Sequence, residues 1–284
     1  MNIVTSSILL GLISMLGYGL STVFSKTIIQ KYGAAKSVAI REIYIVGFCL
    51  ILALPFLHSV QNWQMFLVGI LAGAVGYLPL LAFFKAIEHS PIGIVSPITS
   101  TAPIVSVVLS LIFLGTPVSV LQWVAISIIV IANILISLSV NNSGNNNWRA
   151  GIPYALFAMV GWGVYFFLLI PIARNLGPWT TPLATEGGVL ISSMLFLLVT
   201  KQLPKARQIA DPKVIFPAVC IFVGVVTYAL ACMFALPSIF SSLSQSSGIV
   251  AVVLGAVLLK ERLGLRKRIL TVVMIAGVVL LSLS

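Results

Sequence analysis

The chain has 284 residues, of which 60% are hydrophobic and only 7% are charged, and its mean hydropathy is +1.17. Roughly a quarter of the residues of a soluble domain are charged, so this composition excludes a soluble fold and predicts an integral membrane protein in a lipid bilayer. The net charge of +11 would suggest nucleic-acid binding in a soluble protein, but basic residues in a membrane chain mark topology, and we expect no nucleic-acid partner.

Apolar segments with helical rather than alternating character follow one another along the chain. Each has about 20 residues, the length that an α-helix needs to cross a bilayer. The first segment has no positive stretch before it and no cleavage pattern after it, so we expect a spanning helix rather than a signal peptide. The ten predicted spans cover residues 3–25, 38–57, 64–84, 92–114, 118–139, 152–172, 182–200, 214–235, 238–259 and 268–284.

The basic residues predict how the spans are oriented. Fifteen of the 16 Lys and Arg residues lie in or beside loops that follow odd-numbered spans, and only Arg174 lies on the opposite face. Positive loops stay in the cytoplasm, so the odd-numbered loops are predicted to be cytoplasmic and both termini to point outward. We expect a multi-pass protein of a prokaryotic plasma (inner) membrane.

A polar stretch, NNSGNNN at residues 141–147, separates the first five spans from the last five. We predict a first repeat at 1–140, a linker at 141–148 and a second repeat at 149–284. The halves align with an offset of about 145 residues: GYG at 17–19 matches GWG at 161–163, and ITSTAPIVSVVL from Ile98 matches LSQSSGIVAVVL from Leu243. An odd number of spans inverts the second copy. The predicted fold is therefore all-α, with ten transmembrane helices as two inverted five-helix repeats around a central cavity.

The aromatic-glycine segments GYGLSTVFSK and GWGVYFFLLI, together with VLLKERL after the ninth span, carry a family resemblance. On these segments the chain resembles the drug/metabolite transporter superfamily of the EamA type, over essentially its full length. Lys260 departs from the acidic residue usual in that charged run, and the equivalent exit from the fourth span reads LGTPVSV. The resemblance implies secondary transport of small organic solutes such as amino acids, amines or toxic compounds, often outward. It also implies cytoplasmic termini, opposite to the orientation that the charges predict here.

Ionisable residues inside spans are costly in lipid and usually face a cavity. Glu186 lies about one turn inside the seventh span, where a carboxylate can bind an amine or carry a coupling proton. The alternative is an ion pair with Arg174 across the short loop. Arg41 and Glu42 lie at the corresponding depth of the second span, which places them on the opposite side of the membrane. They can bind a zwitterion or form a structural pair.

Aromatic and polar residues complete the predicted substrate site. Tyr18, Trp162, Tyr77 and Tyr228 come from symmetry-paired spans and should converge near the midplane, where rings hold an apolar or cationic solute. Ordinary aromatic packing is the alternative. Spans 4 and 9 contain polar segments that line a cavity or pack helices closely, and Thr99 and Gln245 are their predicted substrate contacts.

Other functions lack the residues that they require. Cys49, Cys220 and Cys232 lie in apolar spans without a CxxC pair, so we predict structural thiols, no metal site and no cofactor. Intramembrane catalysis would need a Ser-His pair, two aspartates or a histidine cluster, and ATP-driven pumping would need a phosphate-binding loop. We predict a secondary-active transporter, monomeric or homodimeric, that works by alternating access with Glu186 as the candidate for proton coupling. The alternative is a flippase for lipids or lipid-linked metabolites without ion coupling.

Overall fold

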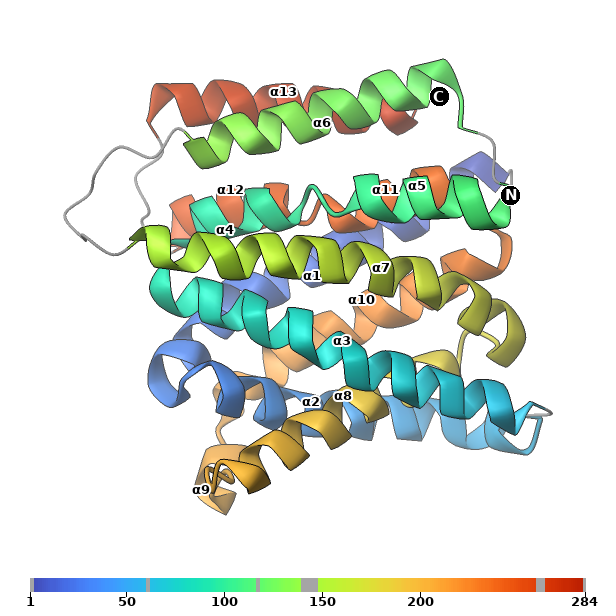
Figure 1. Ribbon diagram of the computed structural model, residues 1–284, viewed down its shortest axis with the longest axis vertical. Coiled ribbons are helices and arrows are strands. Elements are labelled where there is room, and N and C mark those ends of the chain that lie inside the picture. The colour runs from blue at the N-terminus through green and yellow to red at the C-terminus, as the bar shows by residue number, and fades with distance from the viewer. Residues whose placement is uncertain (1–2, 60–61, 116–117, 139–147, 259–263, 283–284) are drawn as a thin grey trace.

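The computed structural model describes residues 3–59, 62–115, 118–138, 148–258 and 264–282, and these residues form helices joined by short connections (Figure 1). The predicted linker at 141–147 and the charged residues 259–263 lie outside the described residues. The helices of the first half are α1 (Ile3–Tyr32), α2 (Ala34–Ala53), η1 (Leu54–Ser59), α3 (Trp63–His89), α4 (Ile92–Thr99), α5 (Pro103–Leu114) and α6 (Val120–Leu138). Those of the second half are η2 (Trp148–Gly151), α7 (Ile152–Leu176), α8 (Thr181–Val199), α9 (Ala206–Ile209), η3 (Pro212–Val214), α10 (Ile215–Phe234), α11 (Pro237–Gln245), α12 (Gly248–Leu258) and α13 (Leu265–Ser282).

The ten predicted spans are present as helices. Among the described residues, seven helical segments are each long and apolar enough to cross a membrane, and α6, the α11–α12 pair and α13 contain shorter apolar stretches. Helices α1 and α3 continue past the predicted spans to Tyr32 and His89. Lys side chains near these helix ends can extend toward the lipid headgroups, so the longer helices remain compatible with a bilayer. Many large apolar side chains are exposed on the outside of the bundle, which suits a surface covered by lipid.

Spans 4 and 9 are each broken near the middle. Span 4 divides into α4 and α5 at Ser100–Ala102, and span 9 divides into α11 and α12 at residues 246–247. Pro103 has no N–H for the helical ladder, and the Thr101 hydroxyl donates to the Ile98 carbonyl at 2.7 Å. In span 9 the Ser246 hydroxyl donates to the Ser242 carbonyl at 2.7 Å in the same way. Both breaks therefore occur where hydroxyl-rich sequence interrupts an apolar helix.

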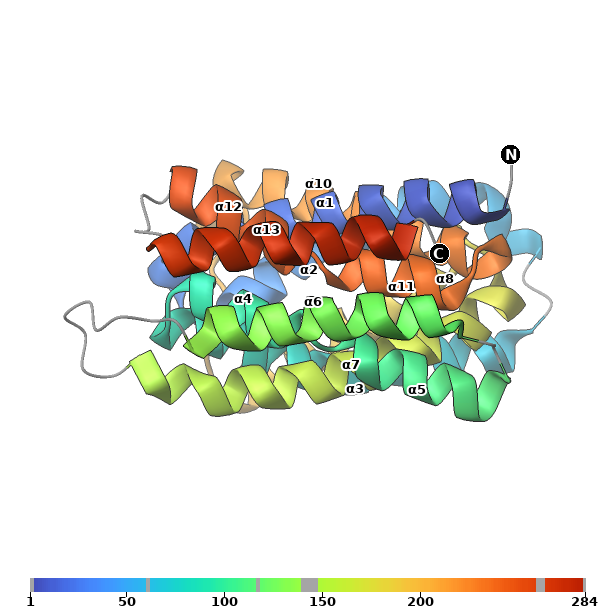
Figure 2. The same cartoon turned by 90° about the horizontal axis from the view of Figure 1, so that it is seen from above.

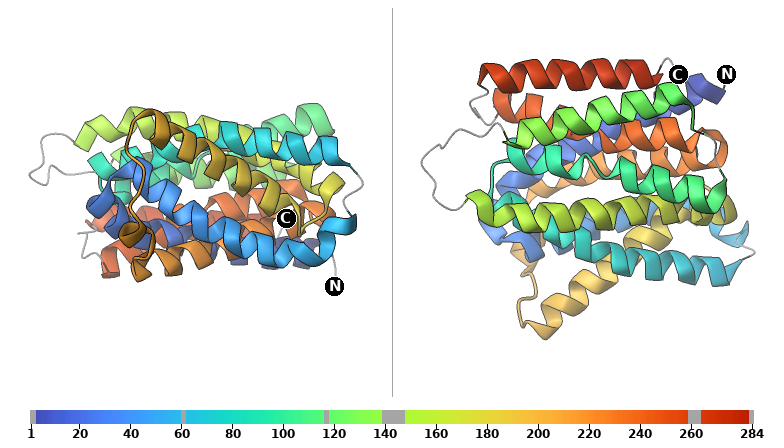
Figure 3. Two further views of the ribbon diagram at one scale, coloured as in Figure 1. Left: turned by 90° about the horizontal axis from the view of Figure 1, so that it is seen from below. Right: turned by 45° about the horizontal axis from the view of Figure 1, so that its top comes forward.

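The two halves run in opposite directions through the bundle. The chain starts at one end of the molecule with α1, whereas α7, the matching first helix of the second half, starts at the other end (Figure 1). Helices α6 and α13 lie side by side at one edge, and α2 and α8 lie at the opposite edge (Figures 2 and 3). Between these edges α1 packs on α10 and α3 packs on α7, which joins the halves around the centre. The predicted all-helical fold of two inverted repeats is confirmed.

Candidate functional site

A central cavity lies between the two halves and encloses about 840 Å³ of empty space, part of it open to solvent. Its walls come from α1, α2, α3, α4, α7, α8 and α10, and from the breaks of spans 4 and 9. Among the described residues, eight of the ten spans therefore contribute, all but those of α6 and α13, so the cavity belongs to neither half alone.

The cavity extends from the middle of the bundle toward the face that carries the odd-numbered loops. Thr22 and Phe83 line it from the last halves of α1 and α3, which end at that face. Ser96 and Ile221 line it from the second turns of α4 and α10, which begin there. This is also the face where the basic residues of the sequence are concentrated.

Three charged side chains meet at the cavity wall although all are buried. The Arg41 Nη2 donates to Glu42 Oε1 at 2.8 Å, and the Arg41 guanidinium lies 4.8 Å from the centre of the Phe84 ring. Glu186 lies beside this pair and interacts electrostatically with both Glu42 and Arg41, and its carboxyl is also close to the Tyr165 hydroxyl. Arg41 and Glu186 line the cavity. Buried charges require close partners, and α2 and α8 supply these partners to each other here.

The position of this cluster corrects two readings of the sequence. Arg41 and Glu42 were expected on the opposite side of the membrane from Glu186, yet α2 packs against α8 and brings all three together. The expectation took the depth of each residue in the membrane from its distance to the helix end. That distance does not give the depth, because helices tilt and begin at different levels. The alternative partner, Arg174, instead donates from its Nε to the Cys232 carbonyl at 3.2 Å.

Aromatic rings form much of the remaining wall. Tyr18 and Trp162 line the cavity together with Phe83, Tyr165 and Phe166. The Trp162 ring centre lies 4.6 Å from that of Phe83, and the Tyr18 ring centre lies 5.8 Å from that of Phe166. Rings of the first half therefore contact rings of the second half at the cavity wall, and Tyr18 and Trp162 both belong to this lining.

The structure places Tyr77 and Tyr228 outside this lining. Helix α3 faces the cavity with Gly76, Leu80 and Phe83, and Tyr77 lies beside this helix face rather than on it. The Tyr77 ring centre lies 6.0 Å from that of Phe196. Tyr228 lies on the same face of α10 as lining residues one and two turns earlier. It packs between the Phe240 ring at 5.1 Å and the ring of the lining residue Phe166 at 4.9 Å.

Polar residues of the two helix breaks also reach the cavity. Thr99 and Gln245 line it, as do Ser96, Ser100 and Ser247. The Ser100 hydroxyl accepts a hydrogen bond from the Gly248 backbone N–H at 2.9 Å, which ties the break of span 4 to the start of α12. The hydroxyl segments therefore join the two halves as well as lining the space between them.

Several lining residues were not among the sequence predictions. Phe83, Tyr165 and Phe166 are ordinary aromatic residues of apolar helices, and nothing in their local sequence separates them from core residues. The available signal was spacing, because Tyr165 lies three positions after Trp162, and Gly76, Leu80 and Phe83 share one helix face.

Comparison with known proteins agrees with this architecture. The model of the EamA-like transporter family matches residues 5–138 and again residues 149–283. The chain belongs to the EamA-like transporter family. It is therefore a membrane transporter and not an enzyme, and each half of the bundle corresponds to one copy of the family's repeating unit.

Individual relatives are distant. The transporter is 28% identical over 135 residues to an uncharacterized protein of Methanocaldococcus jannaschii, covering 47% of this chain and 98% of the relative. It is 24% identical over 211 residues to an uncharacterized transporter of Archaeoglobus fulgidus, covering 73% of this chain and 70% of the relative. A solved crystal structure superposes with a TM-score of 0.69 at 16% identity, over 98% of this chain and 97% of the other, which shows a shared fold.

Proposed function

We propose that this transporter exchanges protons for small organic solutes that carry an amine, by alternating access through the central cavity. Amines, amino acids and related metabolites are the solute classes concerned, with export driven by inward proton movement. Glu186 is the residue that alternates between proton and solute.

The observation that carries the proposal is the charge of the buried cluster. One guanidinium, that of Arg41, faces the carboxyl groups of both Glu42 and Glu186. With both acids ionised the cluster has an excess of one negative charge, which is costly in a site away from bulk water. Either a proton or the cationic group of a solute neutralises it. Once a proton has neutralised the cluster, the cationic solute has no excess charge to bind, and the reverse also holds. The proton and the solute therefore compete for one site, which is what proton-solute exchange requires.

The surroundings of Glu186 suit a cation rather than an anion. Tyr18, Trp162 and Phe166 line the cavity, and aromatic rings attract cations by up to about 2 kcal/mol when desolvated. A flippase for anionic lipids would need free basic groups for the headgroup. Arg41 is the basic residue of the described lining, and it is already paired with Glu42. This favours amine transport over the flippase alternative.

The inverted halves supply the conformational change. Two similar bundles of opposite orientation can rock about a fixed site and exchange their conformations, which exposes the cavity to each face in turn. In the conformation described here the cavity extends toward the odd-numbered loops, which we propose to be cytoplasmic, with both termini on the outside.

Proton movement in proteoliposomes tests this function. Vesicles that contain the purified transporter and an internal pH-sensitive dye are challenged with phenethylamine, putrescine or amino acids from outside. We expect at least one amine to drive a proton flux in the wild type. Glu186→Gln should lower that flux by about tenfold or more, because the amide neither releases a proton nor neutralises a cation.

Glu88→Gln is the matched control, since Glu88 is an exposed carboxylate near the end of α3 and outside the cavity lining. It should leave the proton flux unchanged. An equal flux in wild type and Glu186→Gln would remove Glu186 from the coupling mechanism.

A further inference from the structure

Gln245 is a buried amide at the point where span 9 breaks. It is the last residue of α11, lines the cavity and is only 5% exposed. Its side-chain nitrogen donates to the Ser106 hydroxyl at 2.9 Å and to the Ser241 hydroxyl at 2.7 Å. Both N–H donors of the amide are thereby occupied by α5 and α11.

The neighbouring hydrogen bonds suit the orientation that this amide has in the structure. The Ser106 hydroxyl donates to the Pro103 carbonyl at 3.3 Å, so its oxygen is left to accept from Gln245. The Ser241 oxygen also accepts from the Tyr228 hydroxyl at 3.2 Å. In this orientation the nitrogen faces the Ser106 and Ser241 hydroxyls, whose oxygens lie 3.3 Å apart, and the oxygen faces away from them.

The amide oxygen, Gln245 Oε1, is buried and has no hydrogen-bond partner among the described residues. A buried carbonyl without a donor is unfavourable, and in native structures such a group usually has a partner that is not part of the chain. Here two serines hold the amide nitrogen of a residue that lines the cavity, while the amide oxygen has no donor among the described residues.

We infer that Gln245 Oε1 accepts a hydrogen bond from the transported solute, so that the solute must carry at least one N–H on its cationic group. The inference rests on the proposed amine transport and narrows its substrate class. Glu186 lines the same cavity and is also an acceptor. A primary or secondary ammonium can donate to both Glu186 and Gln245, whereas a quaternary ammonium has the charge but no hydrogen to give.

The two kinds of cation are therefore distinguished by hydrogen bonding rather than by charge. The aromatic rings attract either, because cation-π attraction does not need an N–H. Only the N–H-bearing cation gives Gln245 Oε1 a partner, and a site that buries an acceptor discriminates strongly against analogues that lack the donor.

A series of three ligands with the same ring tests this inference. Binding of 2-phenylethylamine, its N,N-dimethyl derivative and its N,N,N-trimethyl derivative to the purified full chain in detergent is measured by calorimetry. We expect the primary amine to bind about tenfold to a hundredfold more tightly than the trimethyl compound, with the dimethyl compound between them. In Gln245→Leu the ratio of primary to trimethyl affinity should fall below about threefold.

Gln122→Leu is the matched control. Gln122 is a buried glutamine of α6 that bonds with Ser119 outside the cavity lining, and its replacement should preserve the wild-type ratio. The wild-type series decides the matter by itself if Gln245→Leu does not fold. Equal binding of all three ligands to the wild type would overturn this inference and leave amine transport standing. Failure of all three to bind would overturn both.

Discussion

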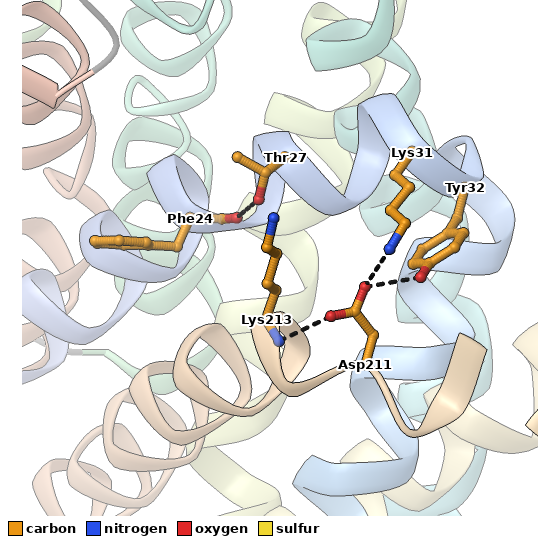
Figure 4. A network of polar contacts seen from close by, with 6 residues as sticks. All are labelled: Phe24, Thr27, Lys31, Tyr32, Asp211 and Lys213. Atoms are coloured by element: carbon orange, nitrogen blue, oxygen red, sulfur yellow. Dashed lines mark hydrogen bonds and ion pairs between the residues drawn. The ribbon is translucent and has the colours of Figure 1, made fainter. Parts of the chain in front are cut away.

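At the scale of single residues, Asp211 shows how a charge outside the bilayer fastens one helix to another. Asp211 lies between α9 and η3, and its Oδ2 accepts from Lys31 Nζ at 2.8 Å and from the Tyr32 hydroxyl at 2.7 Å (Figure 4). Its Oδ1 accepts from the Lys213 backbone N–H at 3.0 Å. These contacts tie the segment before α10 to the last turn of α1. The hydrogen bond from Lys31, followed by those from Tyr32 and Lys213, lowers the pKa of Asp211 to about 2.

The lowered pKa predicts how this contact responds to pH. A carboxyl whose pKa is lower in the folded state stabilises the fold above its unfolded pKa, near 4, and loses that contribution as pH falls from about 4 to about 2. We expect Asp211→Asn to lower the melting temperature by about 1–3 °C at pH 7, since the Lys31 partner is largely exposed. Thermal unfolding in detergent at pH 7, 4 and 2.5 measures the difference, which should shrink toward the lowest pH. A difference that stayed constant over this range would show that the carboxylate charge is not what matters.

At the scale of helices, close packing depends on glycine at the contact between α3 and α8. A Cβ added at Gly73 would lie 1.8 Å from the Thr185 carbonyl oxygen, and one added at Gly188 would lie 2.0 Å from the Ile70 carbonyl oxygen. Only hydrogen fits at both positions, so the two backbones touch. This contact holds α8 where Glu186 can reach the cavity, which links the packing of small residues to the placement of the charged cluster.

Replacing one of these glycines should therefore separate the two helices. We expect Gly73→Ala to destabilise the transporter by about 1–3 kcal/mol, because the contacted atom is rigid backbone. Gly47→Ala in α2 is the control, since nothing lies within 4 Å of the added Cβ, and a helical Gly-to-Ala change is neutral or favourable there. Thermal unfolding of both variants compares them. Equal melting temperatures for Gly73→Ala and wild type would show that α3 and α8 are less tightly packed.

At the scale of the whole molecule, the cavity lies mainly between the middle of the bundle and the face of the odd-numbered loops. The other half contains the α3–α8 contact and the contact of α1 with α11, where a Cβ on Gly11 would lie 2.9 Å from the Leu243 side chain. Both contacts belong to the half of the bundle away from the odd-numbered loops. The molecule is thus asymmetric in conformation although its two halves match in sequence.

This asymmetry predicts from which side the cavity can be labelled. A cysteine placed at Thr22, which lines the cavity, should react about tenfold faster with a membrane-impermeant thiol reagent added at the odd-loop face than at the opposite face. Membrane vesicles of both orientations provide the two faces. The wild-type chain is the blank, because all three of its cysteines are buried. Lys205→Cys, exposed in an odd-numbered loop, reports which face is outside. Faster labelling of Thr22→Cys from the opposite face would contradict this asymmetry of the cavity.

The sequence by itself determined the environment, the number of spans, the inverted repeat and the family, because these follow from composition, segment length and internal similarity. It also named Tyr18, Trp162, Thr99, Gln245, Arg41 and Glu186, all of which the structure places on the cavity wall, since rare polar and aromatic residues stand out in apolar helices. Whether they bind solute remains a prediction.

Only the tertiary structure decided which of these residues meet. It brought Glu186 to Arg41 and Glu42, placed Tyr77 and Tyr228 outside the cavity lining, and left the side-chain oxygen of Gln245 without a partner among the described residues. The physical reason is that hydropathy fixes where a helix crosses the membrane but not its tilt or its rotation about its own axis. Those are set by contacts with neighbouring helices, such as that of Gly73 with Thr185, between residues far apart in the chain.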